Sequence, residues 1–519
     1  MIDTKLLRQK ILDLAIRGKL VRQDPNDEPA SELLKKIKAE KEALIKAGNL
    51  KRDKHESFIF RGDDKRYYEQ IDGKTTDISG EIPFDLPTGW VWCRIKNFAD
   101  VTTGSTPKTS VKSFYGGDIL FVKPPDLGSS KYIKETAETL TKQGAQKSRM
   151  IPAGSVCVCC IGSLGKSSIA SDSVCTNQQI NSLTTVANSE YVYYLCNTTY
   201  FINALHSVAT AITIALVNKS NMERIIIPLP PLAEQERIVV QIESLLKCVD
   251  EIDRESETLE KSLALAKQKI LDLAIRGKLV PQDPKDEPAS ELLKKIKAEK
   301  EALIKAGKMK RDKHESFIFR GDDNCYHENI DGETTDISKE IPFDLPEGWA
   351  WCRMGAIADV ERGSNFTKKD FVKSGVPCIH YGQIHAKFHY STHDAISFIP
   401  DAIARKCRKA SCGDVVMAVT SENFNDVCKS VAWLGNEKAA VGGHTAIIRH
   451  SVFPLYLVFF FNTMFFSRQK EKYYHDGKVV EFPPRALLDI LLPLPPLSEQ
   501  KRIVSQVEKL FAVLETMRG

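Results

Sequence analysis

Three groups of side chains have spacings that could support chemistry, and two of them are short motifs. "GSLGKSS", Gly162–Ser168, is similar to a phosphate-binding loop, but that motif needs a further glycine where this chain has Cys160. Cys157 and Cys160 have the C-x-x-C spacing of a metal site. Both lie in an apolar, strand-like run, so we expect buried structural cysteines and no nucleotide site there.

The third group combines one cysteine with four histidines: Cys378, His380, His385, His389 and His393. Zinc could use residues of these types. The corresponding places in the first half of the chain, whose repeat is described below, hold Phe121, Asp126, Ser130 and Lys134. Because the pattern is not repeated, we predict no metal site and favour contacts of some of these histidines with bases or phosphates.

Catalytic patterns are not evident in the rest of the chain. No Ser-His-Asp spacing, pair of catalytic carboxylates or glycine-rich cofactor loop stands out. "KPPD" at Lys123 is similar to the Asn-Pro-Pro-aromatic motif of adenine methyltransferases, but it lacks the asparagine and the aromatic residue. We therefore predict a chain that is not an enzyme and holds no cofactor. The enzymatic alternative, a methyltransferase that acts alone, would require this chain to bind S-adenosylmethionine.

Lysines and small polar residues gather in loops of two net basic regions, such as "TTGSTPKTSVK", "TNQQIN", "RGSNFTKKD" and "VGGHTA". Lysine and arginine suit phosphates, whereas asparagine, glutamine and histidine suit base edges. A solvated surface explains any one loop, so a DNA-binding role is predicted only because one chain carries two such regions. The candidate DNA-binding residues are Ser105, Thr106, Lys108, Lys123, Lys166, Gln178, Gln179, Asn365, Lys368, Lys369, His385, Lys387, Asn423 and His444.

The two basic regions lie in equivalent parts of an internal repeat. Sliding the chain by 259 residues aligns Gln9–Arg94 with Gln268–Arg353 without a gap, and about 74 of the 86 positions match. Further on the offset becomes 265, where "IIIPLPPLAEQERIV" falls on "ILLPLPPLSEQKRIV", so the second copy has about six extra residues, near "SENFND". Each copy has near-identical ends and a diverged middle, which suggests one task done twice on two targets.

The repeat also contains a long helix. From about Ala233 to Arg276 there is no proline or glycine, and apolar residues alternate in steps of four and three, as in a coiled coil about 65 Å long. The chain termini repeat the two halves of this pattern separately. The predicted core positions are Leu7, Ile11, Leu14, Ile238, Ile242, Leu245, Val249, Ile252, Leu259, Leu263, Ile270, Leu273, Ile503, Val507, Leu510 and Leu514.

The two terminal pieces together would form a second long helix, antiparallel to the first. We predict an α+β fold in which two α+β domains are joined by an antiparallel pair of long coiled-coil helices, pseudo-two-fold symmetric and circularly closed. The predicted boundaries are 1–18 and 498–519 for the halves of the split helix, 19–94 and 278–353 for the scaffold segments, 95–232 and 354–497 for the diverged domains, and 233–277 for the central helix.

Composition is that of an ordinary globular protein of 519 residues with a net charge of +5. The first twenty residues are amphipathic and lack the apolar core of a signal peptide. The longest apolar run, "LYLVFFFNTMFF", is too short to span a bilayer. Thirteen scattered cysteines suggest reduced thiols, so we expect a cytoplasmic protein.

These motifs resemble, as a set, the specificity subunits of type I restriction–modification systems. The likeness covers essentially the whole chain: two "PLPPLxEQxRIV" segments, two "ILDLAIRGKLVxQDPxDEPAS" segments, "GWxWCR" before each diverged domain, and "GSLGKSSIAS…TNQQI" and "VGGH" within them. The resemblance implies that each diverged domain is a target recognition domain that reads one half of a bipartite, asymmetric DNA site.

The resemblance also implies partners. Two modification subunits would bring S-adenosylmethionine and methylate adenine, and two restriction subunits would supply ATP- and Mg-dependent translocation and cleavage. None of that chemistry would reside in this chain. An alternative from another class is a coiled-coil scaffold whose two end domains bind proteins; sequence-selective, salt-dependent binding to duplex DNA would distinguish the two.

Overall fold

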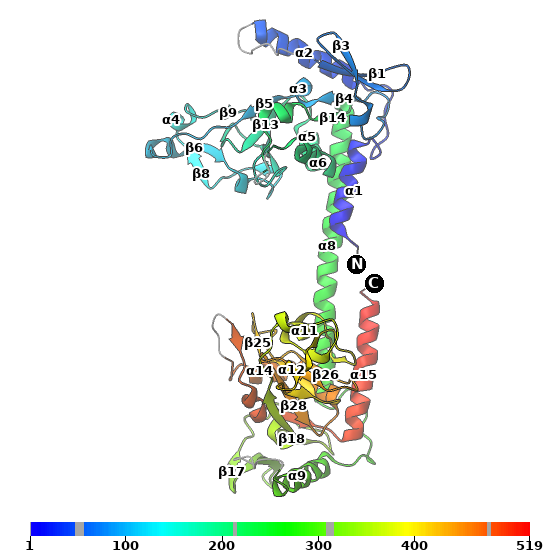
Figure 1. Cartoon of the computed structure of the whole chain (residues 1–519), viewed down its shortest axis with the longest axis vertical. Coiled ribbons are helices and arrows are strands. Elements are labelled where there is room, and N and C mark those ends of the chain that lie inside the picture. The colour runs from blue at the N-terminus through cyan, green and yellow to red at the C-terminus, as the bar shows by residue number, and fades with distance from the viewer. Residues whose placement is uncertain (1, 47–56, 211–214, 308–315, 475–478, 519) are drawn as a thin grey trace. The chain divides into compact units, whose positions relative to one another are not determined.

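The computed structural model describes residues 2–46, 57–210, 215–307, 316–474 and 479–518. It divides into two compact units, Met1–Ser256 (unit 1) and Glu257–Gly519 (unit 2). The fold is α+β, with similar sets of sheets in the two units and one long helix, α8 (Leu232–Ile275), that begins in unit 1 and ends in unit 2 (Figure 1).

The near-identical parts of the repeat form a scaffold in each unit. In unit 1 it consists of α1 (Thr4–Ile16), α2 (Ala30–Lys46), β1 (Ser57–Arg61), β2 (Tyr67–Ile71), β3 (Lys74–Asp77), η1 (Ser79–Glu81), β4 (Val91–Arg94), β14 (Ile226–Leu229) and the first part of α8. In unit 2 it consists of the last part of α8, α9 (Ala289–Lys305), β15 (Ser316–Arg320), β16 (Tyr326–Ile330), β17 (Glu333–Asp336), β18 (Ala350–Arg353), β30 (Leu491–Leu494) and α15 (Leu497–Thr516).

The diverged domain of unit 1 contains two sheets, ordered β5-β13-β10-β11-β7 and β8-β6-β12-β9. Its elements are α3 (Ile95–Phe98), β5 (Asp100–Thr103), η2 (Lys112–Phe114), β6 (Tyr115–Val122), η3 (Pro124–Asp126), β7 (Tyr132–Ile133), β8 (Glu138–Leu140), α4 (Lys142–Ala145), β9 (Met150–Ile151), β10 (Val156–Cys159), β11 (Ser167–Ala170), β12 (Val174–Thr176), β13 (Ile180–Thr184), α5 (Ser189–Cys196), α6 (Thr199–Val208) and α7 (Lys219–Glu223).

The diverged domain of unit 2 has the same topology, with sheets ordered β19-β28-β24-β26-β21 and β22-β20-β27-β23, plus the pair β25-β29. Its elements are α10 (Met354–Ile357), β19 (Ala358–Arg362), η4 (Lys368–Asp370), β20 (Val376–Ile379), α11 (Tyr381–Ala386), β21 (Ser391–Thr392), β22 (Phe398–Ile399), α12 (Asp401–Ala404), β23 (Lys409–Ala410), β24 (Val415–Ala418), β25 (Thr420–Ser421), β26 (Ser430–Trp433), β27 (Ala439–Val441), β28 (Thr445–His450), α13 (Pro454–Phe461), α14 (Met464–Lys470), β29 (Val480–Glu481) and η5 (Pro484–Asp489).

Each diverged domain contains an aromatic stretch that forms two consecutive helices, α5 and α6 in unit 1 and α13 and α14 in unit 2. The break falls at the Asn-Thr pair that both copies contain. Thr198 Oγ1 accepts a hydrogen bond from the Phe201 amide, and Thr463 Oγ1 accepts one from the Phe466 amide. A threonine in this position caps a new helix. The first helix of each pair, α5 or α13, packs its aromatic side chains on the five-stranded sheet.

The terminal helices pack against α8 (Figure 1). In unit 1, Arg8 of α1 pairs with Asp250 of α8 at 2.7 Å, and in unit 2, Lys267 of α8 pairs with Glu515 of α15 at 2.5 Å. These two ion pairs occupy equivalent places in the repeat. In unit 1 the basic residue is on the terminal helix and the acidic one on α8, whereas in unit 2 the basic residue is on α8 and the acidic one on the terminal helix. In unit 2 a second pair, Arg518 with Glu260, shows that α15 runs antiparallel to α8, because Arg518, just after the end of α15, contacts an earlier residue of α8 than Glu515 does. Figure 1 shows the same antiparallel arrangement for α1 and α8 in unit 1.

The buried stripe of these helices is wider than the predicted two-helix seam. Of the predicted core residues, seven are buried and eight are partly buried; the buried ones are Ile11, Ile238, Ile242, Val249, Leu263, Ile503 and Val507. Leu12, Ile16, Val504 and Phe511 are buried in addition, because the helices also pack on the cores of the diverged domains. In contrast, Leu259, predicted as a core position, has 40% of its surface exposed. The four-three spacing of apolar residues predicted the helices correctly, but it did not predict the width of the helix surface that is buried.

The repeated motifs contact one another at a joint in each unit. In unit 1 the buried carboxylate of Glu234, from "LAEQERIV", accepts hydrogen bonds from the Trp90 indole at 2.9 Å and from Gln23 at 3.0 Å. Arg237 forms an ion pair with Asp27 at 2.5 Å. Burial raises the pKa of Glu234. These contacts tie the start of α8 to "GWxWCR" and "QDPxDEP", which gives a physical reason for their identity in both copies.

Unit 2 repeats the joint with the equivalent residues. Glu499 accepts hydrogen bonds from Trp349 at 3.0 Å and Gln282 at 3.1 Å, and Arg502 pairs with Asp286 at 2.6 Å. Burial again raises the pKa of the glutamate.

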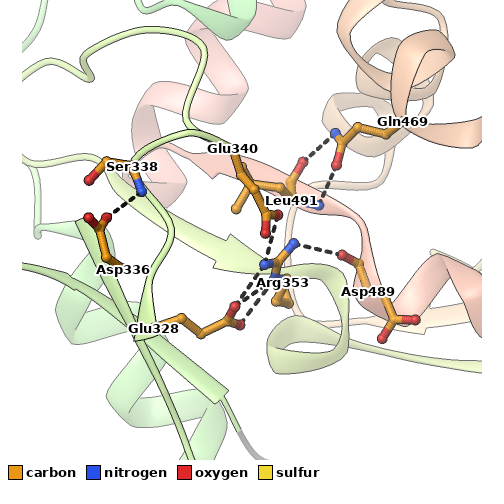
Figure 2. A network of polar contacts seen from close by, with 8 residues as sticks. All are labelled: Glu328, Asp336, Ser338, Glu340, Arg353, Gln469, Asp489 and Leu491. Atoms are coloured by element: carbon orange, nitrogen blue, oxygen red, sulfur yellow. Dashed lines mark hydrogen bonds and ion pairs between the residues drawn. The ribbon is translucent and has the colours of Figure 1, made fainter. Parts of the chain in front are cut away.

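A second repeated contact attaches the small scaffold sheet. Figure 2 shows Arg353 bonded to Glu328, Glu340 and the carbonyl oxygen of Asp489. In unit 1, Arg94 makes the equivalent bonds, including 2.6 Å to Glu69. The scaffold is thus built twice with the same contacts. In the described ranges, no helix is both long and apolar enough to cross a bilayer.

Candidate nucleic-acid interface

Two backbone segments cross at one end of the sheets of the diverged domain in unit 1. The segment after β5 passes over the turn between β12 and β13, where Gly104 donates a backbone hydrogen bond to Ile180 and Ser105 donates one to Thr176. A Cβ on Gly104 would lie 2.2 Å from the Thr176 carbonyl oxygen and 2.3 Å from that of Asn177. Only glycine allows this approach.

Unit 2 has the same crossing. Gly363 follows β19 and donates a backbone hydrogen bond to Thr445, and Ser364 donates one to Val441. A Cβ on Gly363 would lie 2.0 Å from the carbonyl oxygen of Gly442. We call the residues around this crossing, 103–107 with 176–180 and 362–366 with 441–445, the loop crossings.

The loop crossing of unit 1 brings together four of the predicted residues. The Thr106 hydroxyl donates to the Gln178 side chain at 2.6 Å. Ser105 precedes Thr106, and the Gln179 side chain accepts a hydrogen bond from Asn177 at 2.9 Å. Thr106 and Gln178 are exposed at the end of the crossing, which we call its tip. Their mutual bond occupies the Thr106 hydroxyl and leaves the Gln178 NH₂ group accessible.

The three predicted lysines of unit 1 differ in their surroundings. Lys108 and Lys166 are exposed, and the structure gives their ammonium groups no carboxylate partner in its described ranges. Lys166 follows Gly165, whose φ of +84° belongs to the turn between β10 and β11. Lys123, in contrast, pairs with Glu138 at 2.5 Å, so its charge is already compensated.

The loop crossing of unit 2 is open and basic. Asn365 and His444, both predicted, line a cavity of about 590 Å³. The cavity is lined by Arg362, Gly363, Ser364, Asn365, Lys406, Arg408, Gly443 and His444. In the repeat Asn365 takes the place of Thr106, and His444 that of Gln179, so the residues predicted independently in the two halves are structural counterparts.

Aromatic side chains continue from this cavity. The His444 ring lies edge-on to Tyr381, with ring centres 5.2 Å apart, and Tyr381 lies 6.0 Å from the His385 ring. His385 Nε2 lies 3.3 Å from the Thr420 carbonyl oxygen. His380 begins α11, and burial, together with nearby Lys368 and His444, lowers its pKa to about 4.

The remaining predicted residues of unit 2 lie in separate loops. Lys368 and Lys369 form the exposed turn η4, and Lys387 is exposed at the end of α11. The Asn423 amide donates to Asp426 at 2.7 Å and caps its own turn. The loop of Asn423 connects β25 to β26. The whole segment between β24 and β26 is longer than the equivalent turn between β10 and β11 in unit 1, which locates part of the extra sequence of the second copy.

Sequence reasoning missed an arginine at each loop crossing, Arg149 and Arg408. Arg149 donates to the Thr103 carbonyl oxygen at 2.7 Å, and Arg408 donates to that of Arg362 at 2.6 Å. The signal was available: both belong to a Lys-x-Arg triplet at the offset of 259, within otherwise diverged sequence. It was overlooked because the segment is short and lies outside the loops with the most polar composition.

The positions and burial of the cysteines and histidines decide whether they could bind a metal or act as nucleophiles. No group of three or more histidine, cysteine, aspartate or glutamate residues placed to hold a metal ion occurs in the part of the chain that the structure describes. Cys157 and Cys160 are buried, and burial raises the pKa of their thiols to about 11 and about 12. Such thiols stay protonated and are poor nucleophiles.

Several known proteins are similar to this chain in sequence or in fold. Residues 87–261 match the family described as type I restriction modification DNA specificity domain. The chain is 29% identical to the EcoAI type I restriction enzyme specificity subunit of Escherichia coli, over 99% of this chain and 90% of that one. It is 31% identical to the EcoEI specificity subunit of Escherichia coli, over 69% of this chain and 63% of that one.

The chain belongs to the type I restriction–modification specificity subunits. It is a DNA specificity subunit, and such subunits are non-catalytic. A solved chain from work on complex assembly and conformational transition of the type I R-M system has a similar fold, with a TM-score of 0.57 at 19% identity, covering 84% of this chain and 93% of that one. The family match falls mostly in unit 1, whereas the likeness to the EcoAI subunit extends across both units of this specificity subunit.

Proposed function

We propose that each diverged domain is a target recognition domain that reads one half of a bipartite, asymmetric DNA site. The observation that carries this proposal is that two loop crossings have the same backbone but different tip side chains. Thr106 in unit 1 corresponds to Asn365 in unit 2, and Gln179 corresponds to His444. The same fold would place different hydrogen-bonding groups against base edges and so select different sequences.

Roles for the predicted residues follow from their surroundings. Gln178, Gln179, Asn365 and His444 would contact base edges, together with Ser105, Thr106, His385 and Asn423. Lys108, Lys166, Lys368, Lys369 and Lys387 would contact phosphates, together with Lys123. Contacts from Lys123 and Asn423 would first require breaking a bond to Glu138 or Asp426, so we expect smaller effects when these two are replaced.

Partner subunits would carry out the chemistry. We propose that two modification subunits bind this chain and methylate adenine with S-adenosylmethionine, and that two restriction subunits add ATP- and Mg-dependent translocation and cleavage. The EcoAI and EcoEI relatives are specificity subunits of restriction enzymes, which supports this assignment. S-adenosylmethionine, ATP and Mg would thus be bound by partners and not by this chain.

The helices would set the distance between the half-sites. We propose that α1 and α15 are the two halves of one interrupted helix that pairs antiparallel with α8, so that the chain is pseudo-two-fold and circularly closed. The antiparallel contacts inside each unit support this arrangement. Shortening both helices by seven residues, about 10 Å, would then shorten the spacer by about three base pairs.

The small scaffold sheet is our candidate for the contact with the modification subunits. Phe58 and Phe60 on β1 have 55% and 37% of their surfaces exposed, and Phe317 and Phe319 on β15 have 56% and 39%. Packing at the joints accounts for the identity of the buried motifs, but not for these exposed rings. A surface present once per unit fits a partner present in two copies.

A binding measurement tests the sheet. Replacing Phe58 and Phe60 by serine should weaken binding of a purified modification subunit to unit 1 by about tenfold or more, since two large apolar groups lose their contact. Tyr68→His is the matched control, because His327 occupies that place in unit 2. Equal binding by the Phe58→Ser, Phe60→Ser variant and the control would exclude this surface.

Mapping of adenine methylation in the host genome, with and without this gene, tests the main proposal. We expect one asymmetric bipartite motif to lose methylation when the gene is deleted. The purified chain with its modification subunits should bind duplexes carrying that motif with steep salt dependence. If methylation does not change and duplex binding shows no preference, the alternative of a coiled-coil scaffold with protein-binding end domains gains support.

A further inference from the structure

Arg149 and Arg408 are held in the same way at the two loop crossings. Each donates one guanidinium N–H to the carbonyl oxygen of the residue directly before the crossing glycine, Thr103 in unit 1 and Arg362 in unit 2. An arginine side chain has several flexible torsions, and such a bond fixes its end beside the crossing. Guanidinium has five N–H donors in a planar fork, so one bond to a carbonyl leaves others available.

The segment that carries each arginine is bonded to the crossing a second time. In unit 1 the Ser148 hydroxyl donates to the Ser105 carbonyl oxygen at 2.6 Å. In unit 2 the backbone N–H of Arg408 donates to the Ser364 hydroxyl at 2.8 Å. Three segments therefore meet at each crossing, and the arginine occupies the same place relative to the tip residues in both units.

Both arginines are exposed, and each has a lysine in the same segment. Arg149 has no carboxylate partner in the part of the chain that the structure describes, and neither do Lys147 and Lys406, two residues before each arginine. Arg408 pairs with Glu361 at 2.7 Å and still lines the open cavity of unit 2 together with Lys406. A group bound here from solution would be anionic.

We propose that Arg149 and Arg408 each bind a phosphodiester of the DNA backbone and thereby position the adjacent tip residues over the bases. This inference rests on the proposed function and adds the class of group that the site binds. The tip residues differ between the units, whereas the arginine and its tether do not. A contact shared by two readers of different sequences must go to a group that every DNA sequence contains, and that group is the phosphate.

The geometry also suits this role. A guanidinium bonds a phosphate through two parallel N–H groups, and a pre-positioned fork loses less side-chain entropy on binding than a free lysine. Arg149 and Arg408 are positioning residues in this scheme, because the base preference itself comes from Thr106, Gln179, Asn365 and His444.

The test measures how the affinity of the complete complex for duplex DNA depends on salt. The complex contains this chain and its modification subunits, and the duplex carries the motif found by methylation mapping. Arg149→Ala should weaken binding about tenfold and reduce the salt slope by about one. Adding Arg408→Ala should reduce the slope further but by less than a second unit, because Glu361 already compensates part of the Arg408 charge. Base preference should not change at one position alone, because the base-contacting residues remain in place.

Two further variants separate charge from structure. Arg149→Lys keeps the charge and loses the fork, so it should retain most of the salt slope. Lys74→Ala removes the same charge from β3, where unit 2 has Glu333, and should leave the slope unchanged.

Each outcome decides between the claims. A wild-type complex without salt-dependent duplex binding would overturn the proposed function itself. If the wild type binds but Arg149→Ala keeps the full slope, or if preference changes at one base pair, the phosphate assignment is wrong and the proposed function stands. Equal loss of slope in Arg149→Ala and Arg149→Lys would make the role structural and would also overturn the inference.

Discussion

The loop crossings of the two units have the same backbone and different surfaces. In unit 1 the Thr106 hydroxyl is bonded to Gln178, which closes the tip. In unit 2 the same place is an open cavity beside Asn365 and His444. Glycines at the crossing and the tethered arginines are common to both. The backbone of a recognition domain can therefore stay fixed while its tip side chains change.

The scaffold differs from the loop crossings, because its contact residues are the same in both units. Its joints are built from the same residues in both units, down to the indole–carboxylate bonds of Trp90 and Trp349. Changing one partner of such a buried bond leaves the other unsatisfied, at a cost of about 1–3 kcal/mol. Exposed tip residues carry no such constraint. Constant joints and variable tip residues are what the proposed division of the DNA site between the two units would require.

Exchanging a whole recognition domain would test this contrast with the largest expected effect. Replacing 95–227 by the corresponding segment of another specificity subunit should change one half of the methylated motif completely and leave the other half as it was. Methylation-aware sequencing of cells that express the chimera provides the measurement. A change in both half-sites, or in neither, would contradict the division of labour between the units.

Adding a side chain at the crossing should have the next largest effect. Gly104→Val would place a Cβ 2.2 Å from the backbone of Thr176, so the two segments must separate. We expect a loss of about 3 kcal/mol or more in the stability of unit 1, measured by urea unfolding, and loss of its half-site preference. Gly80→Val is the control, because its Cβ would meet no atom within 4 Å. Comparable unfolding of both variants would show that the crossing is not tightly packed.

How much of this was predictable from sequence depends on the range of the interactions. Local periodicity and the internal repeat were enough to predict α8, the terminal helices and the α+β class. The split of the aromatic helices at Thr198 and Thr463 follows from capping, which a hydrophobic pattern does not register.

The candidate site was predictable in part. Polar composition identified Thr106, Gln178, Asn365 and His444, which the structure brings to the loop crossings. It could not reveal that Asn423 is bonded to Asp426, nor that Arg149 lies at the tip, because both depend on contacts between segments.

A drop in pH should destabilise unit 2 more than unit 1, although the effect of each buried histidine should be smaller than that of the Gly104→Val substitution on unit 1. Burial lowers the pKa of His380 and His450 in unit 2 to about 4 from an ordinary value of 6.5. Both histidines are therefore neutral when folded and bind protons on unfolding, so stability falls as the pH drops from 6.5 toward 4. Each should cost about 2 kcal/mol at pH 5.

In unit 1 the described ranges contain one histidine, His206, which is exposed. Pulse proteolysis at pH 7 and pH 5, with fragments mapped to each unit, should therefore show unit 2 opening first. His380→Asn, which can still accept the Gly382 N–H and does not titrate, should reduce the difference, whereas His206→Asn should not. Earlier opening of unit 1 would contradict the assignment.

The helix ion pairs provide the smallest and most exacting comparison. Arg8 pairs with both Asp250 and Asp253, whereas its counterpart Lys267 pairs with one carboxylate, Glu515, among the residues that the structure describes. All these side chains are partly exposed, so solvent screens the charges, and we expect a loss of up to about 1 kcal/mol for Arg8→Ala and about 0.5 kcal/mol for Lys267→Ala in thermal unfolding. High salt should shrink both losses if they arise from charge.

The Lys267 ammonium also lies 5.5 Å from the centre of the Phe511 ring. A loss for Lys267→Ala that persists in high salt would mean that packing of its stem on this ring, and not the ion pair, holds α15 against α8.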